Sequence, residues 1–150
     1  CVYPYLGSIT MGYGKFLLRT KISSALDNFA SLVFLKICYQ HCYALRKRKN
    51  FSFDFSIMGF LWPKEDCSWE QLRLVAYGKN EVCYMQCLWT KSKVDVDTIK
   101  RLQQEYVCED GKEAYYILFS RKGFTDRVLG YEAITQSVRL ITLMYLKKIE

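Results

Sequence analysis

Apolar side chains recur at helical spacing between residues 24 and 47. Positions three and four apart share one face of an α-helix, so this pattern predicts a long helix with an apolar face. We expect it to end near residues 46–49, where four basic side chains suit the helix dipole at least as well as they suit a phosphate contact. The predicted apolar stripe consists of Leu26, Phe29, Ala30, Val33, Phe34, Ile37 and Leu45.

Three strands are expected after this helix, because apolar residues then alternate with polar ones or form short continuous runs. The strands are predicted in residues 51–62, 71–77 and 81–89. Residues 78–80 (Gly-Lys-Asn) are typical of a turn, so we expect the second and third strands to form a hairpin.

Helices and strands alternate in the rest of the chain. Asp95 or Asp97 can cap a helix that carries Val96, Ile99, Leu102 and Tyr106 on its apolar face. Further elements are expected in this order: a turn at Asp110-Gly111, a buried strand at 114–120, a short helix capped by Thr125 and reaching about Ala133, and a strand at 138–146. The predicted fold class is therefore α/β, with a mixed sheet that includes some parallel pairing.

The composition favours one folded domain. The chain has 150 residues, is 51% hydrophobic and contains two prolines, which argues against disorder. No apolar run is long enough to cross a bilayer, so we expect no membrane partner. Residues 1–22 are aromatic and punctuated by glycine, and we interpret them as a lead-in segment from an upstream module. Since the first residue is Cys1 rather than Met, we expect a piece of a longer protein.

Seven cysteines and one histidine are the candidate metal ligands. An odd number of cysteines without a secretion signal favours reduced thiols in a cytoplasmic protein. Cys38, His41 and Cys42 lie close together in the predicted helix, but no second ligand pair follows at a spacing typical of zinc sites. We therefore expect buried thiols, no metal and no cofactor.

Several segments together form a series that resembles a known family. They are CVYPYLG at the start, VFLKIC in the first helix, Gly59-Phe-Leu-Trp62, QLRLVA, MQCLW followed by VDVD, and YYILFSRKGFT. The series resembles the nuclease-like domain of the PD-(D/E)xK superfamily, in the version found at the C-terminal end of prokaryotic AAA-type ATPases. The resemblance implies a restriction-endonuclease-like mixed central sheet flanked by helices over residues 23–150, and an ATPase module in the same chain.

The resemblance also implies that the nuclease site is degenerate. Nucleases of this kind gather carboxylates around Mg²⁺ and use a lysine to assist the attacking water. The family pattern expects acids at Leu35, Gln71, Arg73 and Gln86, and a lysine at Leu88. None of the five has the expected chemistry, and the cation of Arg73 would repel a metal ion. The resemblance thus implies a domain that does not cut nucleic acid.

Two alternatives to a non-catalytic nucleic-acid-binding or assembly module stay open. Acidic side chains at Glu65, Asp66 and Glu70 could supply relocated ligands for an active Mg²⁺-dependent nuclease, although they also fit a solvated loop. A purely structural domain that contacts proteins is the other alternative, and homo-oligomerisation is left open with it.

Basic residues follow two of the predicted strands, and the formal net charge is +7. Loops after the carboxyl ends of strands gather at one edge of an α/β sheet. We therefore predict a basic rim made of Lys91, Lys93, Arg121 and Lys122, with Trp89 nearby. Such a rim suits contact with the phosphate backbone without reading of bases, and it equally suits a solvated charged surface.

Overall fold

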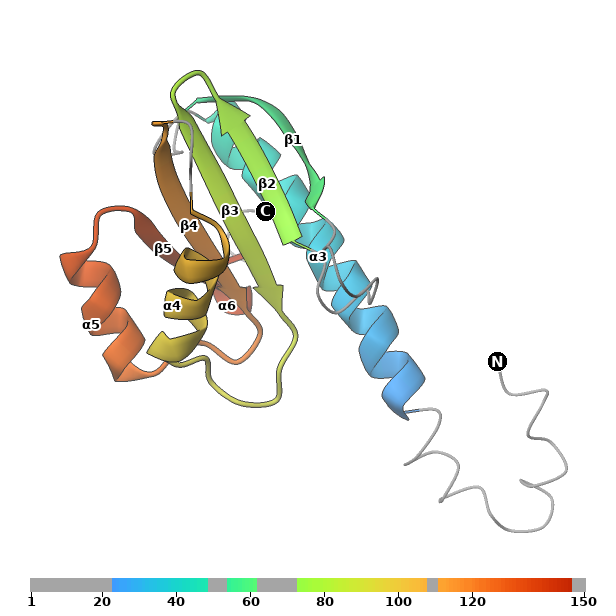
Figure 1. The fold of residues 1–150 in the computed structure, drawn as a ribbon. Helices are drawn as coiled ribbons and strands as arrows, with labels where there is room; N and C mark the ends of the chain where they lie inside the picture. Colours follow the sequence, from blue (N-terminus) through green and yellow to red (C-terminus); the bar gives the residue numbers. More distant parts are fainter. Residues whose placement is uncertain (1–22, 49–53, 62–72, 108–110, 147–150) are drawn as a thin grey trace, which may run out of the picture.

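The computed structural model describes residues 23–48, 54–61, 73–107 and 111–146 (Figure 1). The elements along the chain are α3 (Ser23–Lys47), β1 (Phe55–Leu61), β2 (Arg73–Gly78), β3 (Glu81–Leu88), α4 (Val96–Glu105), β4 (Glu113–Ser120), α5 (Asp126–Ile134), β5 (Val138–Thr142) and α6 (Leu143–Leu146). Apart from the short α6, this is the predicted order of helices and strands. The proposed lead-in at residues 1–22 lies outside the described residues.

The five strands form one mixed sheet in the order β1-β2-β3-β4-β5. β2 pairs antiparallel with β1 and β3, whereas β4 pairs parallel with β3 and β5. The predicted hairpin is confirmed, since β2 and β3 are joined by the turn at residues 78–80, and β3 is the central strand. The α/β fold class is therefore confirmed.

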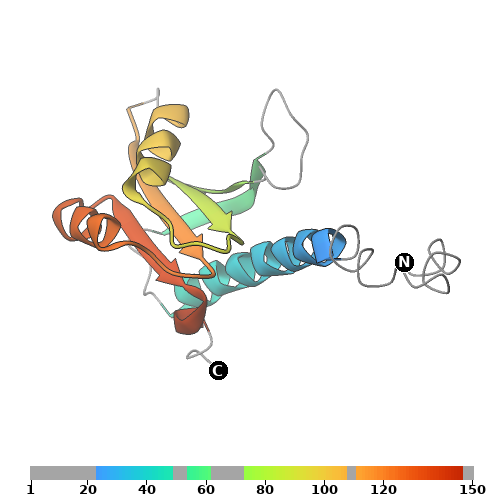
Figure 2. The same cartoon turned by 90° about the horizontal axis from the view of Figure 1, so that it is seen from below.

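Helices cover both faces of this sheet, and each face has its own apolar core. Figure 2 shows α3 across one face, with α4 and α5 on the other. The core under α3 contains Phe34, Met85 and Phe119, and the core under α4 and α5 contains Leu118 and Val128. Side chains alternate between the faces along a strand. Two consecutive residues of β4 thus belong to different cores.

The buried face of α3 differs from the predicted stripe. Phe34 and Leu45 are buried as expected, but Leu26 and Phe29 are 59% and 65% exposed, and Val33 and Ile37 are exposed as well. The helix buries an adjacent stripe instead, which consists of Phe34, Leu35, Cys38, His41, Cys42 and Leu45. Figures 1 and 2 show the physical reason, since the N-terminal end of α3 extends past the sheet and its side chains have little of the sheet to pack against.

The last predicted strand is shorter than expected. Instead of a strand over residues 138–146, β5 ends at Thr142 and the four-residue helix α6 follows. Thr142 pairs with Ser120, which is the last residue of β4. Because the neighbouring strand ends there, residues beyond Thr142 have no ladder to continue, and their backbone turns into a helix.

Exchanging two phenylalanines of α3 for alanine tests which face of the helix is buried. Phe34→Ala should lower the free energy of unfolding by about 3–5 kcal/mol, because it opens a cavity in the core under α3. Phe29→Ala, at an exposed position of the same helix, should change it by about 0.5 kcal/mol or less. Urea unfolding of both variants measures the difference. Equal destabilisation would mean that the α3 face is assigned incorrectly.

Candidate functional site

Three of the five degenerate positions lie on one face of the sheet. Arg73 of β2 and Gln86 of β3 are direct partners in the antiparallel ladder, so they share a face. Leu88, two residues along β3, points the same way and packs against the core under α4 and α5. Leu35 is buried in the core under α3, so the structure places it on the opposite side of the sheet. Gln71 and the loop acids Glu65, Asp66 and Glu70 lie outside the described residues.

The surroundings of Arg73 and Gln86 are largely aromatic. The ring of Tyr84, two residues before Gln86, stacks on Tyr106 and Tyr116 at centroid distances of 5.0 and 6.1 Å. Burial, together with the negative charge of Glu105 and a hydrogen bond with it, raises the pKa of the Tyr106 hydroxyl, and the positive charge of Arg73 partly opposes that rise. Among the described residues, no group of three or more His, Cys, Asp or Glu side chains is arranged to hold a metal ion.

The predicted basic rim is brought together by hydrogen bonds between two loops. The parallel register of β3 and β4 runs to the pair Leu88 and Ser120. Beyond it, Arg121 N donates to the Leu88 carbonyl at 3.1 Å, and Val94 N donates to the Gly123 carbonyl at 3.0 Å. The loops at residues 89–93 and 121–123 therefore run side by side. They carry all four predicted rim residues, Lys91, Lys93, Arg121 and Lys122.

A tight turn at Gly123 shapes the second loop. Gly123 has a φ of 87°, a conformation that side chains with a Cβ rarely adopt. The hydroxyl of the buried Ser120 accepts from Gly123 N at 3.1 Å and donates to the Gly123 carbonyl at 3.0 Å. The turn that presents Arg121 and Lys122 is thus closed by the last residue of β4.

Arg121 lies over the ring of Trp89, which the sequence placed only near the rim. Its guanidinium carbon is 4.3 Å from the indole centroid, a distance typical of a cation–π contact. The indole ring also contacts the buried ring of Phe34 at 5.4 Å between centroids. The charged loop is in this way connected to the core under α3.

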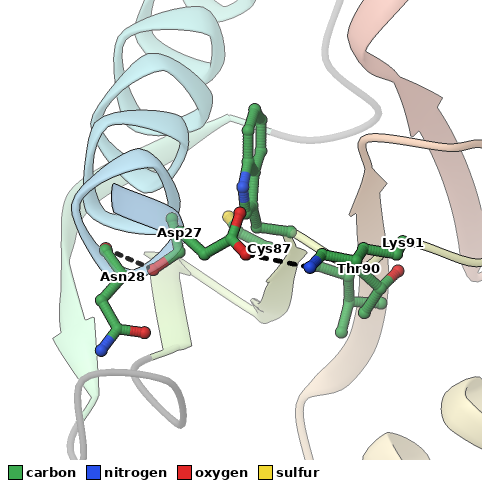
Figure 3. A pocket seen from close by; sticks show the side chains of 8 residues that line it. Asp27, Asn28, Cys87, Thr90 and Lys91 are labelled. Atoms are coloured by element: carbon green, nitrogen blue, oxygen red, sulfur yellow. Dashed lines mark hydrogen bonds and ion pairs between the residues drawn. The ribbon is translucent and has the colours of Figure 1, made fainter. Parts of the chain in front are cut away.

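An open hollow of about 310 Å³ lies beside this stack, between the start of α3 and the end of β3. Figure 3 shows the carboxylate of Asp27, at the start of α3, pointing toward the amino group of Lys91. Lys91 Nζ lies 3.2 Å from Asp27 Oδ2, and both side chains are well exposed. Sequence reasoning missed Asp27, because nothing in the pattern links a residue of the first helix to a loop more than 60 positions later.

Asp95 ties the two loops together at the beginnings of α4 and α5. Its Oδ1 accepts from Val96 N and from the Thr125 hydroxyl, both at 2.8 Å, and its Oδ2 accepts from Arg127 at 3.1 Å. The expected Asp95 cap is confirmed. Thr125 is the N-cap residue of α5, as expected, but its side chain makes no capping bond and donates to Asp95 instead. Hydrogen bonds from Val96 N and Thr125, and the charge of Arg127, lower the pKa of Asp95.

These observations define an α/β domain with a mixed sheet and a basic edge, and they allow a comparison with known proteins. The family model DUF234, described as archaeal and bacterial proteins of unknown function, matches residues 1–100, and the chain belongs to this family. No curated protein and no solved structure matches the chain. In the described part of the chain, no helix has the length and apolar character needed to cross a membrane.

Removing the Asp95 carboxylate should change how stability depends on pH. Because the pKa of Asp95 is lowered in the folded protein, its contribution is complete above the unfolded pKa of about 4. This contribution to stability is lost as the pH falls through the lower pKa that Asp95 has in the folded protein. Thermal unfolding should therefore show Asp95→Asn less stable than the original protein at neutral pH, with the gap closing at acidic pH.

The matched control for this experiment is Asp97→Asn in the first turn of the same helix, where the side chain is exposed. This variant keeps the hydrogen bonds of Asp95. It should therefore still lose stability as the pH falls through the pKa of Asp95 in the folded protein. A gap between Asp95→Asn and the original protein that is the same at every pH would contradict the assigned role.

Proposed function

We propose that this domain is a non-catalytic, nuclease-like module that binds the phosphate backbone of nucleic acid, within a longer cytoplasmic chain that carries an ATPase module. The observation that carries the proposal is the hydrogen-bonded pair of loops at residues 89–93 and 121–123. Four basic side chains from two distant parts of the sequence are presented there at one edge of the sheet.

The chemistry of this edge suits phosphate contact. Lys91, Lys93 and Lys122 are exposed, and Arg121 is half-buried over Trp89. Backbone contacts position a protein on nucleic acid without selecting a sequence, and each contact releases counterions from the phosphates. The net charge of +7 adds a long-range attraction in the same direction. We therefore expect binding that is weak, salt-sensitive and without sequence preference.

The sheet face around Gln86 supports the absence of cleavage. A divalent metal needs several oxygen ligands, and this position offers a guanidinium, an amide and an apolar side chain at Arg73, Gln86 and Leu88. The Nε atom of Arg73 is buried and has no hydrogen-bond partner in the described structure. A second positive charge beside it would be strongly unfavourable.

A second candidate function is assembly with a protein partner. It rests on the exposed apolar stripe of α3, made of Leu26, Phe29, Val33 and Ile37. Contiguous apolar patches on a surface often mark sites of protein contact, including contact between copies of one chain. This function would use α3 and leave the basic rim free.

Charge reversal at the rim should weaken binding. The double variant Lys93→Glu/Lys122→Glu should raise the Kd for a labelled duplex. The logarithm of the association constant should also fall less steeply with the logarithm of the salt concentration, by about 0.9 in slope for each phosphate that the protein no longer neutralises. The matched control is Lys79→Glu with Lys112→Glu, which reverses the same charge at the opposite edge of the sheet. Fluorescence anisotropy at several salt concentrations measures both.

If the two double variants weaken duplex binding equally, only a general charge effect is left. If the original protein does not bind at low salt, the assembly function is favoured.

We also expect no cleavage of plasmid or oligonucleotide substrates in Mg²⁺ or Mn²⁺. Nicking that disappears in a Glu65→Ala/Glu70→Ala variant would show relocated metal ligands, and the active-nuclease alternative would be correct.

A gain-of-binding variant tests the site itself. Arg73→Asp, Gln86→Glu and Leu88→Lys together should increase Mn²⁺ affinity in titration calorimetry, because they place two carboxylates opposite each other on one sheet face. A folded triple variant without that increase would count against the assigned positions.

A further inference from the structure

We infer that Arg121, stacked on Trp89, is a platform for an unpaired base, so that the preferred ligand of the rim is a single strand rather than a duplex. This inference rests on the proposed function and narrows it. Phosphate contact alone would not distinguish the two kinds of nucleic acid at this edge, whereas a flat stacking surface would.

The platform is built before any ligand arrives. The guanidinium lies 4.3 Å from the indole centroid, and the indole contacts Phe34, whose side chain is only 1% exposed. The backbone of Arg121 is fixed by its hydrogen bond to Leu88. A guanidinium is planar and loses little conformational freedom on binding when it is already held in place. Unpaired bases stack on such planes as they do on aromatic rings.

The hollow beside the platform suits a base better than a phosphate. It shares Trp89 and Lys91 with the rim, and its volume of about 310 Å³ falls at the small end of ligand pockets. Asp27 and Lys91 in its wall neutralise each other, and a carboxylate accepts hydrogen bonds from the amino groups of bases. The Trp89 Nε1 donor is buried and has no hydrogen-bond partner in the described structure.

A base in a duplex reaches such a platform only after it has been unpaired and unstacked, which costs a few kcal/mol. Single strands do not carry this cost. A groove of cations around a stacking group is the usual arrangement in proteins that bind single strands without sequence preference. The rim supplies the cations, and Arg121 on Trp89 supplies the stacking group.

The test compares three ligands by anisotropy: a short single-stranded oligonucleotide, an abasic strand of the same length, and a duplex. The original protein should bind the intact strand about tenfold more tightly than the abasic strand, which has the same phosphates. Arg121→Lys keeps the charge but removes the planar group. This variant should lose most of that tenfold difference and keep its affinity for the abasic strand and the duplex.

The control is Arg101→Lys, the same substitution at an exposed position of α4 outside the rim, which should keep the preference for the intact strand. Thermal unfolding of both variants checks that the loop remains folded. Equal affinity of the original protein for intact and abasic strands would overturn the platform while leaving phosphate binding in place. Unchanged preference in Arg121→Lys would also overturn it. Failure of all three ligands to bind at low salt would overturn both this inference and the proposed function.

Discussion

The parallel pairing of β3 with β4 determines where every candidate functional side chain of the basic rim lies. Its register is unbroken from Glu81 and Glu113 to Leu88 and Ser120, and a further parallel bridge joins Val94 to Phe124 beyond the strand ends. Parallel strands bring their carboxyl ends to the same edge. Two loops that are separated by about 30 positions in the sequence therefore share a single edge, and their basic residues form one surface there.

Several weak interactions then decide how much of that surface charge is available to a ligand. Lys91 is paired with Asp27, and Arg127 of α5 is paired with Asp95. Exposed ion pairs of this kind contribute about 0.2–1 kcal/mol, so a phosphate can compete for Lys91. Arg127 differs because its partner Asp95 also accepts hydrogen bonds from Val96 N and Thr125 at the beginnings of α4 and α5. In the proposed function, ligand contact therefore belongs to Lys91, Lys93, Arg121 and Lys122, and Arg127 positions the loops.

Sequence patterns predicted the elements that depend on local periodicity and turn residues. The β2–β3 hairpin followed from alternation around the Gly-Lys-Asn turn, and the start of α4 followed from a capping aspartate before an apolar stripe. The basic rim was predictable because loop positions follow from strand order. The buried face of α3 was not, since two adjacent apolar stripes compete, and only the extent of the sheet decides between them. The shortened β5 depends likewise on where β4 ends.

The candidate site was predictable to a smaller extent. Pairing of Arg73 with Gln86 could be expected from hairpin geometry, but the burial of Leu35 on the opposite face depends on the rotation of α3 against the sheet. The Asp27–Lys91 pair and the Arg121–Trp89 stack join distant segments through side-chain rotamers, and no pattern along the chain encodes them. These contacts give the rim its chemical character, and they become visible only when the fold is known.

The central claim is that the edge formed by the loops at residues 89–93 and 121–123 is the ligand-binding surface. Hydrogen–deuterium exchange of the whole chain, with and without a single-stranded oligonucleotide at low salt, tests this claim most directly. We predict slower exchange in these two loops and in the first turns of α4 and α5, with no change in the β2–β3 turn at the opposite edge. Protection confined to the exposed stripe of α3, or absent from both loops, would contradict the claim.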